Sequence, residues 1–108
     1  MRKTYIDDVW KVTATIPKGK VTTYGAIADY LALGSARMVG WALSQLPLFE
    51  DNVPAHRVLN RKGELSGRNS FPTPDLMQKR LEADGVVVIN DKVVEFEDLF
   101  WHPAESEL

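Results

Sequence analysis

Two short amphipathic segments on either side of Gly34-Ser35 constrain this chain most. Residues 24–32 place apolar side chains on one face at helical spacing, and residues 35–46 do the same. Thr23 is suited to cap the first helix and Gly34 to end it, while Ser35 can cap the second. Two helices joined by so short a turn predict a helix-turn-helix, a motif that often places its second helix against DNA.

The outward face of the second helix is unusual for a helix that reads bases. Its core-facing positions are Val39, Ala42, Leu43 and Leu46, whereas Arg37, Gly40, Trp41 and Ser44 face outward. A helix that reads the major groove normally offers several long polar side chains, and this one offers a single arginine. Small residues let a helix backbone approach the narrow minor groove closely. They also permit close packing of two helices, so both interpretations stay open.

The remaining pattern predicts further helices and a hairpin. An amphipathic helix is expected over residues 4–16, and another is expected to run from Thr73, its N-cap, to Gly85. Apolar runs on both sides of Asn90-Asp91 predict a β-hairpin. These elements favour an α+β, winged-helix-like DNA-binding fold, and residues 1–108 fit a single domain.

The absence of cysteine excludes several kinds of chemistry. Without a thiol the chain has no disulfide, thiolate nucleophile or cysteine-based zinc site. His56 and His102 are its only histidines, and they are too far apart in sequence to suggest a metal cluster. We therefore expect neither a metal nor a cofactor. The sequence shows no signal peptide and no apolar run of membrane length, so a cytoplasmic protein is expected.

Charge is unevenly distributed along the chain. The formal net charge of −2 argues mildly against DNA binding, because contacts between cations and phosphates usually supply most of the affinity. Four cations nevertheless cluster in mid-chain: Arg57, Arg61, Lys62 and Arg68. A local basic face on an acidic body is compatible with moderate, salt-sensitive binding, and the alternative is an ordinary solvated surface.

Four motifs follow one another between residues 16 and 86. They are Pro17-x-Gly19-x-Val21-Thr22-Thr23-Tyr24, Ser35-Ala36-Arg37-Met38-Val39-Gly40, Pro54-Ala55-His56-Arg57-Val58 and Gly63-x-Leu65-x-Gly67. Each motif is a weak to moderate signal alone, but together, in order and correctly spaced, they are strong. In this arrangement the chain resembles the DNA-binding domain of the O6-alkylguanine-DNA alkyltransferases. The resemblance implies a helix-turn-helix fold that binds double-stranded DNA.

Three positions depart from the pattern of that family. Ala55 stands where the transferases carry their nucleophilic cysteine, and an alanine methyl group cannot attack carbon. Arg68 stands where an aromatic residue is usual, and Leu46 where the transferases have a hinge asparagine. Loss of the cysteine in a short protein of this outline resembles the alkyltransferase-like proteins, the non-enzymatic relatives. Some of those carry tryptophan at the position of Ala55.

The resemblance also implies roles for individual residues. The implied DNA-binding residues are Tyr24, Ala36, Arg37, Gly40, Arg61 and Lys62. The implied lesion pocket combines the loop over residues 53–69 with the helix-turn-helix over residues 24–46, through Tyr24, Val53, Pro54, Ala55 and Arg68. Arg37 would fill the gap that a flipped base leaves, and Tyr24 would crowd the phosphate of the flipped nucleotide. Arg68 would lie over or beside the base as a cation, whereas His56 would keep only a structural hydrogen bond.

The sequence thus predicts a protein that binds O6-alkylguanine lesions in duplex DNA by docking in the minor groove and flipping the base, without alkyl transfer. The same resemblance implies that it marks lesions for nucleotide excision repair proteins and shields them from a transferase. A monomer is expected. Two alternatives stay open: a winged-helix regulator that binds undamaged DNA, and an enzyme that uses another nucleophile, such as His56 or Glu64.

Overall fold

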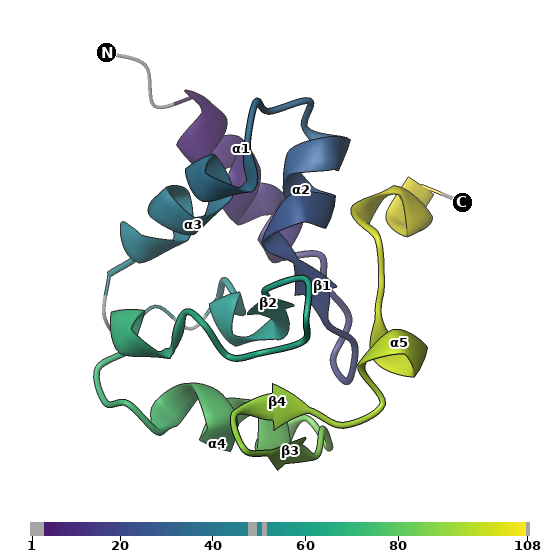
Figure 1. Ribbon diagram of the computed structural model, residues 1–108. Coiled ribbons are helices and arrows are strands. Elements are labelled where there is room, and N and C mark those ends of the chain that lie inside the picture. The colour runs from purple at the N-terminus through teal and green to yellow at the C-terminus, as the bar shows by residue number, and fades with distance from the viewer. Residues whose placement is uncertain (1–3, 48–49, 51, 108) are drawn as a thin grey trace.

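The computed structural model describes residues 4–47, 50 and 52–107. In chain order its elements, with η for a 3₁₀ helix, are α1 (Thr4–Thr13), β1 (Thr22–Thr23), α2 (Tyr24–Tyr30), α3 (Ala36–Ser44), η1 (Ala55–Arg57), β2 (Val58–Leu59), η2 (Arg68–Ser70), α4 (Leu76–Ala83), β3 (Val88–Ile89), β4 (Lys92–Val93), α5 (Phe96–Leu99) and η3 (Pro103–Glu107). The helices α1, α2 and α3 lie together, and α4 with the β3–β4 hairpin lies across from them (Figure 1). None of the described helices is long and apolar enough to cross a membrane.

The first three helices pack around one apolar cluster. Its buried side chains include Ile6 and Val9 of α1, Ile27 of α2, and Val39 and Leu43 of α3. A hydrogen bond also connects α1 to α3, because the indole Nε1 of Trp10 donates to the Ala42 carbonyl 2.8 Å away. Thr23 caps α2 as predicted, its Oγ1 accepting a hydrogen bond from the Ala26 backbone N–H at 3.0 Å. Core packing and a cap therefore fix the predicted helix-turn-helix in place.

The turn between α2 and α3 differs from the predicted one. The helix ends at Tyr30, and Ala32, rather than Gly34, adopts the left-handed backbone conformation, with φ of 56°. The Leu33 N–H closes the turn by donating to the Ala28 carbonyl at 2.9 Å. Leu33 thereby packs against the first apolar cluster. The left-handed residue that follows the helix is therefore Ala32 and not the predicted glycine.

Two predicted side-chain caps are absent. Ser35 precedes α3, but its side chain makes no capping hydrogen bond. The prediction that Thr73 caps the fourth helix was wrong, because α4 begins at Leu76 and Asp75 occupies the N-cap position. The Thr73 hydroxyl instead donates to the Asp75 carboxylate at 2.8 Å. The predicted end of α4 is confirmed, since Gly85 follows the helix in the left-handed conformation, with φ of 89°.

A short parallel strand pair lies between two apolar clusters. Thr22 of β1 pairs with Val58 of β2, and Thr23 pairs with Leu59. Successive side chains of a strand point to opposite faces, so Val58 joins the first cluster and Leu59 joins the second. The second cluster consists of Val21, Leu59, Leu65, Met77, Leu81, Val86, Val88 and Val93. This pair therefore connects the helix-turn-helix to the half of the molecule built on α4.

The predicted hairpin is also present, and the chain near the C-terminus packs back on the core. Asn90 and Asp91 both have positive φ, at 53° and 61°, as a two-residue hairpin turn requires, and β3 pairs antiparallel with β4. Near the C-terminus the Trp101 N–H donates to the Val21 carbonyl at 2.8 Å. The indole side chain of Trp101 is buried in the first cluster.

One buried network joins α4, η1 and the turn before β1. The Asp84 carboxylate accepts hydrogen bonds from Arg57 Nε at 2.7 Å and from Arg57 Nη2 at 3.1 Å. His56 Nε2 lies 2.9 Å from the same carboxylate, which confirms the structural role predicted for this histidine. Arg57 Nη1 also donates to the Ile16 carbonyl at 2.8 Å. The side chains of Arg57 and Asp84 are only 15% and 8% exposed, so this ion pair is shielded from water.

Burial and hydrogen bonding set the protonation of this network. Burial lowers the pKa of His56, although its contact with Asp84 opposes the shift. The neutral imidazole can therefore donate its Nε2 proton to Asp84. Burial alone would raise the pKa of the Asp84 carboxyl, but hydrogen bonds from Arg57 and His56 outweigh it and hold that pKa below its ordinary value.

Acidification should destabilise the protein in two steps. Both pKa values are lower in the folded protein, so the unfolded chain binds more protons as pH falls and the free energy of unfolding decreases. The loss from His56 should begin below about pH 6.5, and the loss from Asp84 below about pH 4. Urea denaturation across this pH range measures both steps.

Two variants assign these steps. His56→Gln should remove the first step and retain the second. Asp84→Asn should reduce the second step and lower the free energy of unfolding at neutral pH by about 3 kcal/mol, because Arg57 then stays buried without its counter-charge. An Asp84→Asn protein with unchanged stability and an unchanged pH profile would contradict this account of the network.

Candidate functional site

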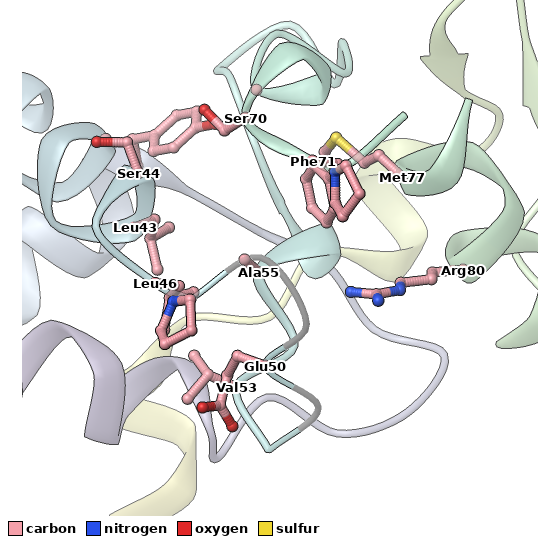
Figure 2. A pocket seen from close by; sticks show the side chains of 15 residues that line it. Leu43, Ser44, Leu46, Glu50, Val53, Ala55, Ser70, Phe71, Met77 and Arg80 are labelled. Atoms are coloured by element: carbon pink, nitrogen blue, oxygen red, sulfur yellow. The ribbon is translucent and has the colours of Figure 1, made fainter. Parts of the chain in front are cut away.

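A cavity opens where the two apolar clusters meet (Figure 2). Leu43 of the first cluster, Met77 of the second and Ala55 of η1 all line it. The volume of the cavity is about 50 Å³. This space holds a few water molecules, so a larger guest has to displace side chains at the rim.

Tyr24 forms one wall of the cavity and is held between two glycines. A methyl group at Gly67 would lie 2.5 Å from the Tyr24 hydroxyl oxygen, and one at Gly40 would lie 3.9 Å from the Tyr24 ring. Burial raises the pKa of Tyr24, and a hydrogen bond with the Ser66 side chain offsets this only in part, so the hydroxyl stays protonated at neutral pH. The absence of a side chain at Gly67 therefore makes room for the tyrosine.

The outer face of α3 adjoins the same wall. A shallow, mostly apolar surface there is lined by Tyr24, Ala36, Arg37, Gly40 and Trp41. Tyr24 and Gly40 line both this surface and the cavity, so the two are neighbours. Arg37 is exposed, and Trp41 is 53% exposed. The structure thus brings together Tyr24, Ala36, Arg37 and Gly40, whose roles in binding DNA stay predictions.

Arg61 and Lys62 lie elsewhere. Both are exposed in the turn after β2, and they line a separate groove against the β3–β4 hairpin and α5. That groove also contains the acidic side chains of Glu95, Glu97 and Asp98, which would repel phosphate. Neither cation of this turn lines the α3 surface, and their contact with the DNA backbone stays a prediction.

Only part of the predicted pocket lines this cavity. Tyr24, Val53 and Ala55 line it, whereas Pro54 and Arg68 do not. Ala55 is the first residue of η1, the turn that the Arg57–Asp84 ion pair anchors to α4. Because the side chain of Ala55 ends at Cβ, it brings no nucleophilic atom to the cavity.

The two alternative nucleophiles face other partners. His56 is directed to Asp84, 2.9 Å away, and Glu64 accepts a hydrogen bond from Asn60 Nδ2 at 2.8 Å. Neither His56 nor Glu64 is among the residues that line the cavity. An attack by either side chain on a guest in the cavity therefore has no support in this geometry.

Arg68, which was predicted to lie over or beside the flipped base, does not line this cavity. Its guanidinium turns towards the hairpin, where Nη1 lies 3.4 Å from the Leu65 carbonyl and 3.5 Å from the Asp91 carboxylate. Asp91 lies at the tip of the hairpin turn, which no local pattern in the sequence places beside Arg68. The pair is long and exposed, and such pairs contribute less than about 1 kcal/mol. Gly67 and Ser70, from the same segment, do line the cavity.

Sequence reasoning missed a second wall, formed by Phe71, Met77 and Arg80. Neither Met77 nor Arg80 carried a functional prediction. These two residues are three apart in α4 and therefore share a face of that helix. That spacing could have placed the arginine beside a buried methionine, but not beside a cavity. The rim residues Ser44, at the end of α3, and Leu46, Pro47 and Glu50, after it, were missed in the same way.

Comparison with known proteins identifies the class to which this architecture belongs. Residues 4–86 match the family described as 6-O-methylguanine DNA methyltransferase, DNA binding domain. The chain belongs to this family. Its α+β helix-turn-helix fold is that of the family, as the sequence predicted.

Individual relatives narrow the class further. The chain is 37% identical over 100 residues to Alkyltransferase-like protein 1 of Schizosaccharomyces pombe, covering 88% of this chain and 92% of the relative. It is 38% identical over 97 residues to the DNA base-flipping protein of Escherichia coli, covering 87% of this chain and 71% of the relative. The crystal structure of S. pombe Atl1 in complex with damaged DNA containing O6-carboxymethylguanine matches with a TM-score of 0.80 at 33% identity, over 95% of this chain and 100% of that one. The predicted resemblance to the alkyltransferase-like proteins is thereby confirmed.

Gly67→Ala should destabilise the protein through Tyr24. The added methyl group would lie 2.5 Å from the Tyr24 hydroxyl, so one of the two must move. The free energy of unfolding should fall by about 1–3 kcal/mol, as in other overpacked sites. In a Tyr24→Phe background the same change should cost less than half as much, because the clashing oxygen is gone.

Urea denaturation of the four proteins in this double-mutant cycle gives the coupling energy. Gly34→Ala is the control, because nothing lies within 4 Å of a methyl group added there. Equal costs of Gly67→Ala in the two backgrounds would show that Tyr24 does not fill this space.

Proposed function

We propose that this protein binds O6-alkylguanine in duplex DNA, turns the modified base out of the helix and holds it without transferring the alkyl group. One observation carries the proposal: the outer surface of α3 and the cavity share a wall made of Tyr24 and Gly40. A base that leaves the duplex at α3 would therefore reach the cavity directly. There it would meet the methyl group of Ala55, at the position of the transferase cysteine.

The relatives support this proposal. One is called a DNA base-flipping protein, and the other is an alkyltransferase-like protein whose structure was determined with DNA containing O6-carboxymethylguanine. The chain covers most of the length of both. Extending lesion binding from these relatives to this chain therefore requires no segment outside the matched region.

The α3 surface would dock in the minor groove. Ala36 and Gly40 have small side chains or none, so the backbone of α3 can approach the floor of a narrow groove. Arg37 would enter the duplex, where its planar guanidinium replaces part of the stacking that the flipped base gives up. Unstacking costs roughly a few kcal/mol and costs least for a damaged base, which favours lesions over normal guanine. Tyr24, at the entrance, would crowd the phosphate of the extruded nucleotide.

The absence of a thiol determines what happens after binding. No cysteine is present to accept an alkyl group, so a bound lesion stays unrepaired. We further propose that the monomeric protein on its lesion marks the site for nucleotide excision repair proteins. Occupation of the flipped base would also shield it from a transferase.

The first test compares duplexes with and without a single O6-methylguanine. Fluorescence anisotropy should give at least about tenfold tighter binding to the modified duplex, and DNA carrying a labelled methyl group should leave no label on the protein. Equal affinity for the two duplexes would instead favour a regulator of undamaged DNA. Label on the protein would show that another side chain acts as a nucleophile.

Arg37→Ala should weaken binding to the modified duplex by about tenfold or more, because the gap in the stack is then left empty. Arg61→Ala is the matched control, since it removes the same charge from a groove that does not adjoin the cavity. Its effect should be smaller and similar for modified and unmodified DNA, as expected for a contact to phosphate. Full affinity of Arg37→Ala would exclude the insertion of this side chain.

A further inference from the structure

Arg80 is the cationic side chain that the structure places in the cavity wall. It extends from α4, and Figure 2 shows its guanidinium pointing towards η1, where Ala55 lies. The guanidinium carbon lies 5.7 Å from the centroid of the Phe71 ring, which also lines the cavity. This contact holds the flat guanidinium against an aromatic wall.

Within the described part of the chain, no carboxylate forms an ion pair with Arg80. The residue one helical turn away is Asp84, at the spacing where an ion pair within a helix forms. Both oxygens of Asp84 accept hydrogen bonds from Arg57 or His56, and Asp84 forms no ion pair with Arg80. The buried network therefore leaves the guanidinium of Arg80 free to meet a guest.

The acidic residue of the cavity rim lies away from Arg80. Glu50 accepts a hydrogen bond from the Asn52 backbone N–H at 2.8 Å. In Figure 2 its carboxylate lies beside Val53, apart from Arg80. The charge of Arg80 is therefore not neutralised from across the cavity.

We propose that Arg80 gives the cavity a preference for O6-alkyl groups that end in an anion, such as a carboxylate. This inference rests on the proposed function, which places the alkyl group beside Ala55. A carboxylate there can accept two parallel N–H donors from the planar guanidinium. A neutral alkyl group of the same size removes water from Arg80 and returns no partner, which is unfavourable for a half-buried cation.

The test compares two lesions that differ in charge but hardly in shape. One duplex carries O6-carboxymethylguanine, and the other carries its neutral amide, O6-carbamoylmethylguanine. Fluorescence anisotropy at neutral pH gives the Kd for each with the wild-type protein, Arg80→Gln, Arg80→Lys and Lys79→Gln. Lys79→Gln is the matched control, because Lys79 is 68% exposed, pairs with Asp75 and does not line the cavity.

The wild-type protein should bind the carboxymethyl duplex about tenfold more tightly than the carbamoylmethyl duplex, a difference of about 1.4 kcal/mol. Arg80→Gln should bring this ratio close to one, Arg80→Lys should retain part of it, and Lys79→Gln should leave it unchanged. Each ratio comes from one protein preparation, so a loss of folded protein alters both affinities together and cancels.

The failure of this inference is distinguishable from the failure of the proposed function. If both modified duplexes bind more tightly than unmodified DNA but equally with each other, Arg80 does not discriminate by charge. A tenfold ratio that persists in Arg80→Gln would likewise exclude Arg80 and assign the preference to another residue. If neither modified duplex binds more tightly than normal guanine, the proposed function itself is wrong, and this inference falls with it.

Discussion

The Asp84 carboxylate is the group on which the rest of this structure depends. It is hydrogen-bonded to the side chains of Arg57 and His56 in η1. Arg57 also donates a hydrogen bond to the carbonyl of Ile16, which precedes β1. One buried charge thus fixes α4, η1 and the entry to the helix-turn-helix relative to one another. Ala55 begins η1, so this network also fixes the wall of the cavity at which a transferase would place its sulfur. His56 therefore has a structural role in this chain, although there is no thiol for it to activate.

The cavity and the α3 surface adjoin each other because they share a wall. Tyr24 begins α2, and its ring contacts both α3, near Gly40, and the segment at Gly67. Gly40 and Gly67, which lack side chains, therefore leave the space for Tyr24, and Tyr24 separates the α3 surface from the cavity. In a protein that flips a base, the energy gained in the cavity has to offset the loss of stacking in the duplex. In the proposed complex, this common wall would let the contacts at α3 and in the cavity form together.

Electrostatics explain how a chain with a net charge of −2 can offer a site for a nucleic acid. Its arginines differ in whether a carboxylate neutralises them. Arg57 forms an ion pair with Asp84, and Arg68 forms a longer one with Asp91. Arg80 has no acidic partner among the described residues. Arg37 stands exposed on the α3 surface. The position of each guanidinium relative to the nearest carboxylate, rather than the total charge, decides which of them can meet DNA or a modified base.

The local elements and the missing nucleophile could be predicted from the sequence. Apolar spacing fixed the helix-turn-helix, Asn90-Asp91 fixed the hairpin, and Ala55 within an otherwise intact motif excluded thiolate chemistry, because each depends on residues close together in the chain. Which side chains face the cavity depends on the packing of segments that are distant in sequence. Arg80 of α4 lines the cavity together with Ala55 of η1, whereas the guanidinium of Arg68 lies near Asp91 of the hairpin. The turn after α2 also departs from the local glycine signal, since Ala32 rather than Gly34 adopts the left-handed conformation and Leu33 packs against the first cluster.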